Sequence, residues 1–174
     1  PLEIRIEGRP VAITMRTPGH DAELAAGFLY TEGVIDGHDD LHAMAHVDEP
    51  SNPKGNTIDT ILAPGVPAGR RHAADRNLYA SSSCGVCGKA TIDRLLVNTI
   101  PITHPIDPKP KVLFELPDRL RAHQAVFAQT GGLHAAALFD VNGKLEVSRE
   151  DIGRHNAVDK VIGALLGTAS TDAN

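Results

Sequence analysis

The N-terminal part of the chain alternates between apolar and polar positions at the spacing of β-strands. Leu2–Ile6 alternates in this way, residues 8–10 supply a turn, and residues 11–15 follow as a second strand, which predicts a β-hairpin. Residues 41–47 and Thr57–Leu62 have the length and pattern of two further strands. This part of the chain is therefore predicted to be mostly strands, with one helix inserted among them.

The inserted helix is predicted between residues 17 and 33. Thr17 and Pro18 are the residue types of a helix N-cap and a first helical position, and Gly33 is that of a helix end. Acidic residues in the first turn suit the positive end of the helix dipole, and an apolar stripe follows them. These residues are Asp21 and Glu23, and then Ala25, Phe28 and Leu29.

Helical patterns continue in the second half of the chain. Residues 90–97 predict a short helix, and the proline-bearing residues 101–110 predict a linker. A further helix is predicted from Pro117 to about residue 129, ended by the glycines that follow. This half of the chain therefore contains several helices of moderate length.

Strand-like and helical patterns alternate after residue 130. Residues 133–140 predict a buried strand, Asn142 and Gly143 a hairpin turn, and residues 145–148 the returning strand. Residues 153–166 predict the clearest helix of the chain. Its apolar residues recur at i, i+3, i+4 and i+7 and predict the face that points to the core, which consists of Val158, Val161, Ile162 and Leu165.

Strands interleaved with helices predict an α/β or α+β fold with a mixed sheet. Residues 64–76 form a polar, glycine-rich connection, which is the candidate boundary between two lobes. We therefore expect a strand-rich N-terminal lobe at residues 1–76 and a second α/β lobe at residues 77–174.

Composition narrows the class of protein. The chain of 174 residues is long enough for one good core, and its 41% hydrophobic and 22% charged residues are ordinary for a globular protein. A net charge of −5 argues against a nucleic-acid binder that relies on phosphate contacts. No run reaches the roughly 18 apolar residues of a membrane span, and two cysteines do not make a disulfide framework. We therefore expect a cytoplasmic protein with no nucleic-acid or membrane partner.

The two cysteines, Cys84 and Cys87, are three positions apart among glycines and serines. A structural zinc site commonly needs four cysteine or histidine ligands, and this pair supplies two. Zinc deaminases add a His-x-Glu motif, which none of the nine histidines here provides. A disulfide-exchange pair and a pair of simply buried cysteines are two further interpretations.

A persulfide carrier is the fourth interpretation of the cysteine pair. Placement just before a helix predicted from about Gly88 would favour the thiolate form, and Lys89 and Arg94 add positive charge nearby. The second thiol could attack the inner sulfur of a persulfide and expel the outer sulfur as sulfide. The residues permit this chemistry and are also compatible with the other three interpretations.

Five segments in this order resemble the signature blocks of the FdhD family of sulfur carrier proteins. Three of them are SSCGVCGK at residues 82–89, TGGLHAAAL at residues 130–138 and EDIGRHNAVDK at residues 150–160. The other two are PLEI at residues 1–4 and TPGHDAELAAGFL at residues 17–29. The family pattern continues beyond Gly167 with further strand–helix units, so this chain is expected to lack the C-terminal part of that pattern.

The resemblance implies a cytidine-deaminase-like three-layer fold without zinc catalysis and without a tightly bound metal of its own. It implies sulfur transfer from a cysteine desulfurase to the molybdenum or tungsten bis(guanine dinucleotide) form of the molybdopterin cofactor, for formate dehydrogenase. Cys84 would carry the persulfide and Cys87 would be its accessory thiol. The family also implies a homodimer. The competing function is a cofactor-binding or apoenzyme-binding chaperone whose cysteines sense redox state or bind metal.

The residues of the block at 130–138 also have simpler interpretations. Thr130, Gly131 and Gly132 fit a helix end followed by a strand, or a glycine turn whose N–H groups receive an anionic ligand. His134 fits a hydrogen-bonded core histidine, and the family block raises it to a pocket residue.

The last helix carries the third set of candidates. Arg154, His155 and Asn156 lie in its first turn, where the helix dipole favours anions, and we expect them to line the site for the pyrophosphate-bearing cofactor. Glu150–Arg154 and Asp151–His155 have i, i+4 spacing. We expect Asp159 and Lys160 to lie on an exposed, solvated face of this helix.

Overall fold

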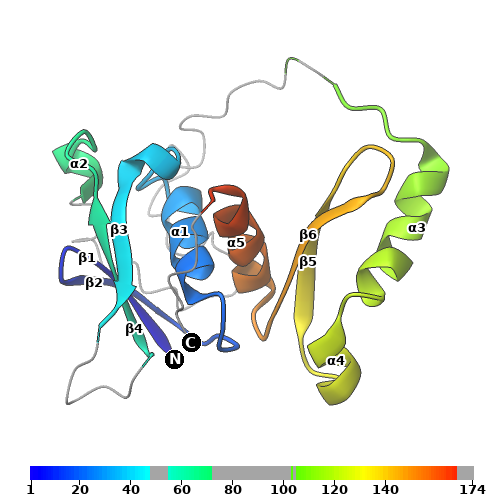
Figure 1. Cartoon of the computed structure of the whole chain (residues 1–174), viewed down its shortest axis with the longest axis horizontal. Coiled ribbons are helices and arrows are strands. Elements are labelled where there is room, and N and C mark those ends of the chain that lie inside the picture. The colour runs from blue at the N-terminus through cyan, green and yellow to red at the C-terminus, as the bar shows by residue number, and fades with distance from the viewer. Residues whose placement is uncertain (48–54, 72–102, 104, 168–174) are drawn as a thin grey trace, which may run out of the picture.

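Sheets and helices alternate as layers across the molecule (Figure 1). The computed structural model describes residues 1–47, 55–71, 103 and 105–167. A four-stranded sheet is followed by α1 (Asp21–Thr31) and α5 (Arg154–Leu165), then by a two-stranded sheet, and then by α3 (Pro110–Arg121) and α4 (Ala125–Thr130). The structure is therefore a mixed α/β fold, as expected.

The larger sheet is mixed, with strand order β2-β1-β4-β3. Its strands are β1 (Leu2–Ile6), β2 (Arg9–Thr14), β3 (Leu41–His46) and β4 (Thr57–Leu62). β1 pairs with β2 in antiparallel and with β4 in parallel orientation, and β3 pairs with β4 in antiparallel orientation. The predicted hairpin and both additional strands are confirmed.

The first hairpin turns through Glu7 and Gly8, which both have positive φ, 50° and 79°. Two central residues with positive φ match the right-handed twist of the strands they join. The N–H of Gly8 donates to both carboxylate oxygens of Asp59, at 3.1 and 3.0 Å, so β4 anchors the turn.

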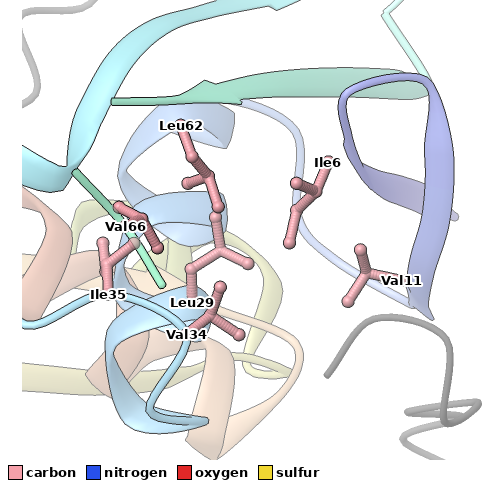
Figure 2. Packing of buried hydrophobic residues seen from close by; sticks show 7 residues of the cluster. All are labelled: Ile6, Val11, Leu29, Val34, Ile35, Leu62 and Val66. Carbon is pink, nitrogen blue, oxygen red and sulfur yellow. The ribbon is translucent and has the colours of Figure 1, made fainter. Parts of the chain in front are cut away.

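One face of the sheet is covered by α1 and buries the core. Leu2, Ile4, Leu24, Ala25 and Ile58 form one buried cluster between β1, β4 and α1. The second cluster, drawn in Figure 2, consists of Ile6, Val11, Leu29, Val34, Ile35, Leu62 and Val66. Removing this apolar surface from water stabilises the fold at roughly 25 cal/mol per Å².

The predicted start of α1 was wrong. The helix begins at Asp21, and its N-cap is His20, with φ 58° and no side-chain capping bond. Thr17 does not cap the helix, because the carboxylate of Asp151 accepts its N–H at 3.0 Å and its hydroxyl accepts the N–H of Ile152 at 3.0 Å. The predicted helix end is confirmed, since Gly33 has φ 72° and its N–H donates to Tyr30.

A single helix from Pro117 was also wrong. Pro110 occupies the start of α3, where a missing N–H costs nothing, and Pro117 lies inside that helix. The helical pattern then breaks at Gln124, which has φ −89° and ψ 69°, and α4 follows. Of the segment predicted as a linker, only its last residue, Pro110, is helical, and residues 105–109 have no regular secondary structure. In the described parts of the chain, the remaining helical pieces are the short α2 (Ala68–Arg71) and η1 (His38–Asp40).

The second hairpin consists of β5 (His134–Phe139) and β6 (Leu145–Asp151), in antiparallel pairing. The turn at Asn142 and Gly143 is confirmed, with Gly143 at φ 78°. Backbone N–H groups of Lys144 and Asn142 bond the carboxylate of Asp140 and lower its pKa. The expectation of a buried strand was wrong, because no residue of β5 is fully buried.

The predicted core face of α5 was only partly right, because Val161 is buried as expected but the outer two of its four residues are not. Val158 is 46% and Leu165 56% exposed. Apart from Val161, the buried residues of this helix are small or polar, namely Asn156, Ala157, Asp159, Lys160 and Gly163. The reason is that this helix packs directly against α1, which favours small side chains over the apolar stripe.

α1 and α5 touch backbone to backbone at two glycines. A Cβ atom built on Gly27 would lie 1.9 Å from the carbonyl oxygen of Asp159, and one built on Gly163 would lie 1.9 Å from that of Glu23. Such distances leave no room for any side chain. The two glycines therefore set how closely the helices approach.

Several expectations fall outside the described residues. These are both cysteines, the helix predicted at residues 90–97 and part of the connection at residues 64–76. The division into lobes at residue 76 stays a prediction.

Candidate functional site at the start of α5

Three parts of the chain meet at one end of the second hairpin (Figure 1). β6 ends at Asp151, α5 begins at Arg154, and β5 begins at His134, which pairs with Asp151 in the strand register. The block at residues 130–138 and the block at residues 150–160 are thus neighbours in space. The segment that follows β2 joins them through Thr17, whose N–H donates to Asp151 and whose hydroxyl accepts the N–H of Ile152.

Asp151 is the centre of this arrangement. Its carboxylate is fully buried and accepts hydrogen bonds from the N–H groups of Thr17 and Gly153, at 3.0 and 2.9 Å. It also accepts from the amide of Asn156 at 3.0 Å and lies 2.7 Å from the ammonium nitrogen of Lys160. A buried carboxylate with four donors is fully compensated for the water it lost.

Lys160 is buried, contrary to the exposed face expected for it and for Asp159. Its side chain is 1% exposed, and its ammonium group donates to the backbone oxygen of Thr17 at 2.9 Å as well as to Asp151. Asp159 is 9% exposed. The i, i+4 rule failed here because Asp151 lies before the helix and pairs with Lys160, in the second turn, instead of with His155.

Asn156 is committed to the protein interior. Its amide nitrogen donates to the carbonyl of Met15 at 2.8 Å and to Asp151, and its amide oxygen accepts from the hydroxyl of Thr14 at 3.2 Å. Any effect of Asn156 on a ligand would therefore be indirect, through the position of the helix start.

Arg154 and His155 are the exposed side chains of the first turn of α5. Gly153 is the N-cap, and its carbonyl accepts the N–H of Ala157. This is the first hydrogen bond within the helix, so the backbone N–H groups of the helical residues before Ala157 have no acceptor within the helix. A cationic and an imidazole side chain thus project next to the positive end of a helix of 12 residues.

The glycine turn before β5 ends α4, as predicted. Gly131 has φ 68°, and its N–H donates to the carbonyl of Phe127 at 2.7 Å. Thr130 donates its hydroxyl to Val126 at 2.9 Å and accepts the N–H of Gly132 at 3.4 Å. All three residues of the turn are exposed. The N–H of Gly131 is thus used by the helix end.

His134 is exposed, so the expectation of a core histidine was wrong. Its register partner is the buried Asp151, and the next pair on the same face is Ala136 and Arg149. Arg149 reaches α1, so this face of the hairpin points to the helix layer. His134 therefore stands at the open edge of that face, beside the start of α5.

Two bidentate ion pairs at the start of α1 were not predicted from the sequence. Arg149 donates to both oxygens of Glu23, at 2.5 and 2.7 Å, and Arg16 donates to both oxygens of Asp21, at 2.9 and 2.8 Å. The hydrogen bond to Glu23 raises the pKa of Arg149. The acidic residues of the first turn were predicted to interact with the helix dipole alone. Arg149 is 126 positions from Glu23, so no local spacing points to it, whereas Arg16 is only five positions before Asp21 but lies outside the helix.

His20 and His46 flank these two carboxylates. The ring nitrogen Nδ1 of His20 lies 3.2 Å from Glu23, and Nε2 of His46 lies 3.6 Å from Asp21. Despite this gathering of charge, the described part of the chain contains no group of three or more His, Cys, Asp or Glu side chains arranged to hold a metal ion. Among the described helices, none combines the length and the apolar character needed to cross a membrane.

Comparison with known proteins identifies the family. The model of the FdhD/NarQ family matches residues 1–173. The chain belongs to the FdhD/NarQ family. The family resemblance found in the sequence is thereby confirmed.

Curated relatives of this FdhD/NarQ chain are named sulfur carrier protein FdhD. The protein from Streptomyces avermitilis is 50% identical over 176 residues, which cover 98% of this chain and 62% of the relative. The protein from Mycobacterium tuberculosis is 48% identical over 171 residues, covering 94% of this chain and 62% of the relative. The chain thus spans about three fifths of the length of these relatives.

A solved structure shares the fold of this FdhD/NarQ chain. It is a formate dehydrogenase accessory protein from Desulfotalea psychrophila, with a TM-score of 0.62 and 24% sequence identity. The match covers 97% of this chain and 59% of that protein. At this identity the likeness concerns the fold.

Proposed function

We propose that this protein is a sulfur carrier that accepts a sulfur atom on Cys84 and delivers it to a metal cofactor for formate dehydrogenase. The single observation behind this proposal is the Cys-x-x-Cys pair, the only cysteines of a chain that belongs to the FdhD/NarQ family. Relatives about 50% identical carry the name sulfur carrier protein, which supports the same role.

Loading requires a nucleophilic thiolate and a donor persulfide. The Cys84 thiolate attacks the outer sulfur of a persulfide on a cysteine desulfurase. The sulfur–sulfur bond of the donor breaks, its cysteine leaves as a thiolate, and Cys84 becomes the persulfide. Oxidation states balance, because one sulfur(0) moves between two thiolates. A lowered thiol pKa speeds this step by raising the thiolate fraction.

Delivery can use the second thiol. The Cys87 thiolate attacks the inner sulfur of the Cys84 persulfide, forms a disulfide and expels the outer sulfur as sulfide at the acceptor. Two thiols lose two electrons, and the transferred sulfur gains them. A cellular dithiol then reduces the disulfide before the next cycle.

The acceptor we propose is the molybdenum or tungsten bis(guanine dinucleotide) cofactor, as a substrate. Its pyrophosphate groups are anionic, and the start of α5 offers Arg154, His155 and a helix N-terminus toward solvent. His134 and the turn at residues 130–132 lie at the same end of the hairpin and would complete the contact. Asn156 would act by holding the helix start.

The fold and assembly belong to the same proposal. We infer a cytidine-deaminase-like core, for which the β5–β6 sheet between the α1/α5 layer and α3 is supporting evidence. The partners would be a cysteine desulfurase and formate dehydrogenase, and the carrier would act as a homodimer. The alternative is a chaperone that binds the cofactor or the apoenzyme and uses its cysteines for redox sensing or metal binding.

Mass spectrometry separates these functions. The protein is incubated with a cysteine desulfurase and free cysteine, and intact masses are compared with those of the Cys84→Ser and Cys87→Ser variants. A carrier gains one sulfur atom on a cysteine, and reductant removes it. Absence of any sulfur gain, together with a bound metal in elemental analysis, would favour the alternative.

A further inference from the structure

The crossing of α1 and α5 contains a carboxyl group that the proposed sulfur chemistry does not use. Asp159 is 9% exposed, and its backbone oxygen faces Gly27 at the closest approach of the two helices. Its side-chain oxygen Oδ1 lies 3.1 Å from the hydroxyl of Thr31, at the end of α1. The carboxyl thus sits where one helix could loosen from the other.

The hydroxyl of Thr31 has two neighbours and one proton to donate. Its oxygen lies 3.1 Å from the backbone carbonyl of Phe28 and 3.1 Å from Asp159. The carbonyl can only accept a hydrogen bond. If Thr31 donates to Phe28, the contact with Asp159 is a hydrogen bond only when the carboxyl donates. A protonated Asp159 satisfies both contacts at once, whereas an ionised one competes with the carbonyl for a single proton.

The charged surroundings of Asp159 also disfavour its ionised form. Glu32, at the end of α1, is a like charge nearby. Cations on the neighbouring elements are paired elsewhere, since Lys160 contacts Asp151 and Arg149 contacts Glu23. The remaining titratable groups of the two strands packed on α5 are His134, which is exposed, Glu146, which pairs with Lys144, and Glu150, which accepts N–H groups of α4.

We propose that Asp159 holds a proton in the folded protein and that losing this proton weakens the α1–α5 crossing. The device is a proton-dependent contact between Asp159 and Thr31. Because α5 also carries Arg154, His155 and Lys160, the position of the helix start would depend on the same proton.

Burial raises the pKa of Asp159 from 3.8 to about 7, which supports this geometry. Between these two pH values the folded state binds a proton that the unfolded chain has released. The free energy of unfolding therefore falls as pH rises through this window, and it changes little from this group below or above it. The equilibrium constant for unfolding should rise about a hundredfold between pH 5 and pH 8 on account of this carboxyl.

The test compares urea unfolding of the wild-type protein and Asp159→Asn between pH 5 and pH 8. The asparagine amide can donate to Thr31 but cannot ionise, so the difference between the two curves isolates the carboxyl. Between pH 5 and pH 8, we expect the equilibrium constant for unfolding of the wild-type protein to rise about a hundredfold relative to that of Asp159→Asn. A difference that does not change with pH would overturn the proposal.

Two further measurements keep the proposal testable if the variant folds poorly. Carboxyl ¹³C NMR of the folded wild-type protein should show Asp159 titrating near neutral pH, and a midpoint near 4 would overturn the proposal. Thr31→Val should lower this midpoint, because the protonated carboxyl loses the hydroxyl oxygen that accepts its proton, whereas Thr31→Ser should leave it in place. An unchanged or raised midpoint in Thr31→Val would refute the pairing.

Discussion

The ammonium nitrogen of Lys160 lies 2.7 Å from the carboxylate of Asp151, and both side chains are almost fully buried. Asp151 ends β6, whereas Lys160 lies in the second turn of α5, so the pair fixes the angle at which the helix leaves the strand. Thr17 adds the segment after β2 to the same contact. Arg154 and His155 are therefore exposed on a helix turn whose position is fixed by the buried ion pair.

We expect Lys160→Met to lower the free energy of unfolding by about 3 kcal/mol or more, because it leaves a buried carboxylate without its cation. Urea unfolding at neutral pH measures the change. Lys111→Met is the matched control, because Lys111 is 88% exposed and its ion pair with Glu115 is long, at 3.9 Å. This substitution should lower the free energy of unfolding by less than about 0.5 kcal/mol. The double variant Asp151→Asn/Lys160→Met should lose less than the sum of the single variants, and strict additivity would contradict the pairing.

Because α1 and α5 cross so closely, we expect that even a methyl side chain is not tolerated at the two glycines of the crossing. Gly163→Ala and Gly27→Ala each place a Cβ atom 1.9 Å from a backbone oxygen, so the helices must separate. We expect each to cost about 3 kcal/mol or more in thermal or urea unfolding. Gly69→Ala, in α2 with open space around it, should be neutral or slightly stabilising. Equal effects at the three glycines would show that the close approach is incorrect.

The bidentate contact between Arg149 and Glu23 ties β6 to α1. We expect Arg149→Lys to lose stability by about 1 kcal/mol, because a lysine cannot reproduce two parallel hydrogen bonds. A double-mutant cycle with Glu23→Gln should give a coupling energy of about 1–3 kcal/mol. A coupling near zero would mean that the contact contributes only as a surface ion pair does.

Strands were predicted correctly where apolar and polar residues alternate in step with buried and less buried side chains. Leu2, Ile4 and Ile6 are buried on one face of β1, as their spacing indicates, and Gly143 adopts the positive φ that its turn requires. Such features depend on residues close together in sequence. The core of the N-terminal sheet was therefore predictable.

Helix prediction failed where distant contacts decide the outcome. Thr17 looked like a cap, but Asp151, 134 positions later in sequence, takes its N–H. The polar Asp159 and Lys160 looked solvated, but both are buried, because α5 packs by way of Gly163 and an internal ion pair. A single sequence shows the residue types and not the partners. For the same reason, the block at residues 150–160 could be recognised from the sequence, but the hydrogen bonds and the ion pair by which Asp151 holds it in place could not.

The exposed start of α5 predicts a loss of anion affinity in one variant. Arg154→Ala should weaken binding of guanosine diphosphate, a probe for the dinucleotide end of the proposed substrate, about tenfold, because one charge-assisted hydrogen bond to phosphate is lost. Isothermal titration calorimetry measures the affinity. Arg121→Ala is the matched control, since Arg121 is an exposed arginine in the last turn of α3, and its affinity should not change. Equal losses in both variants would indicate a diffuse charge effect, and no loss in Arg154→Ala would remove this helix start from the proposed site.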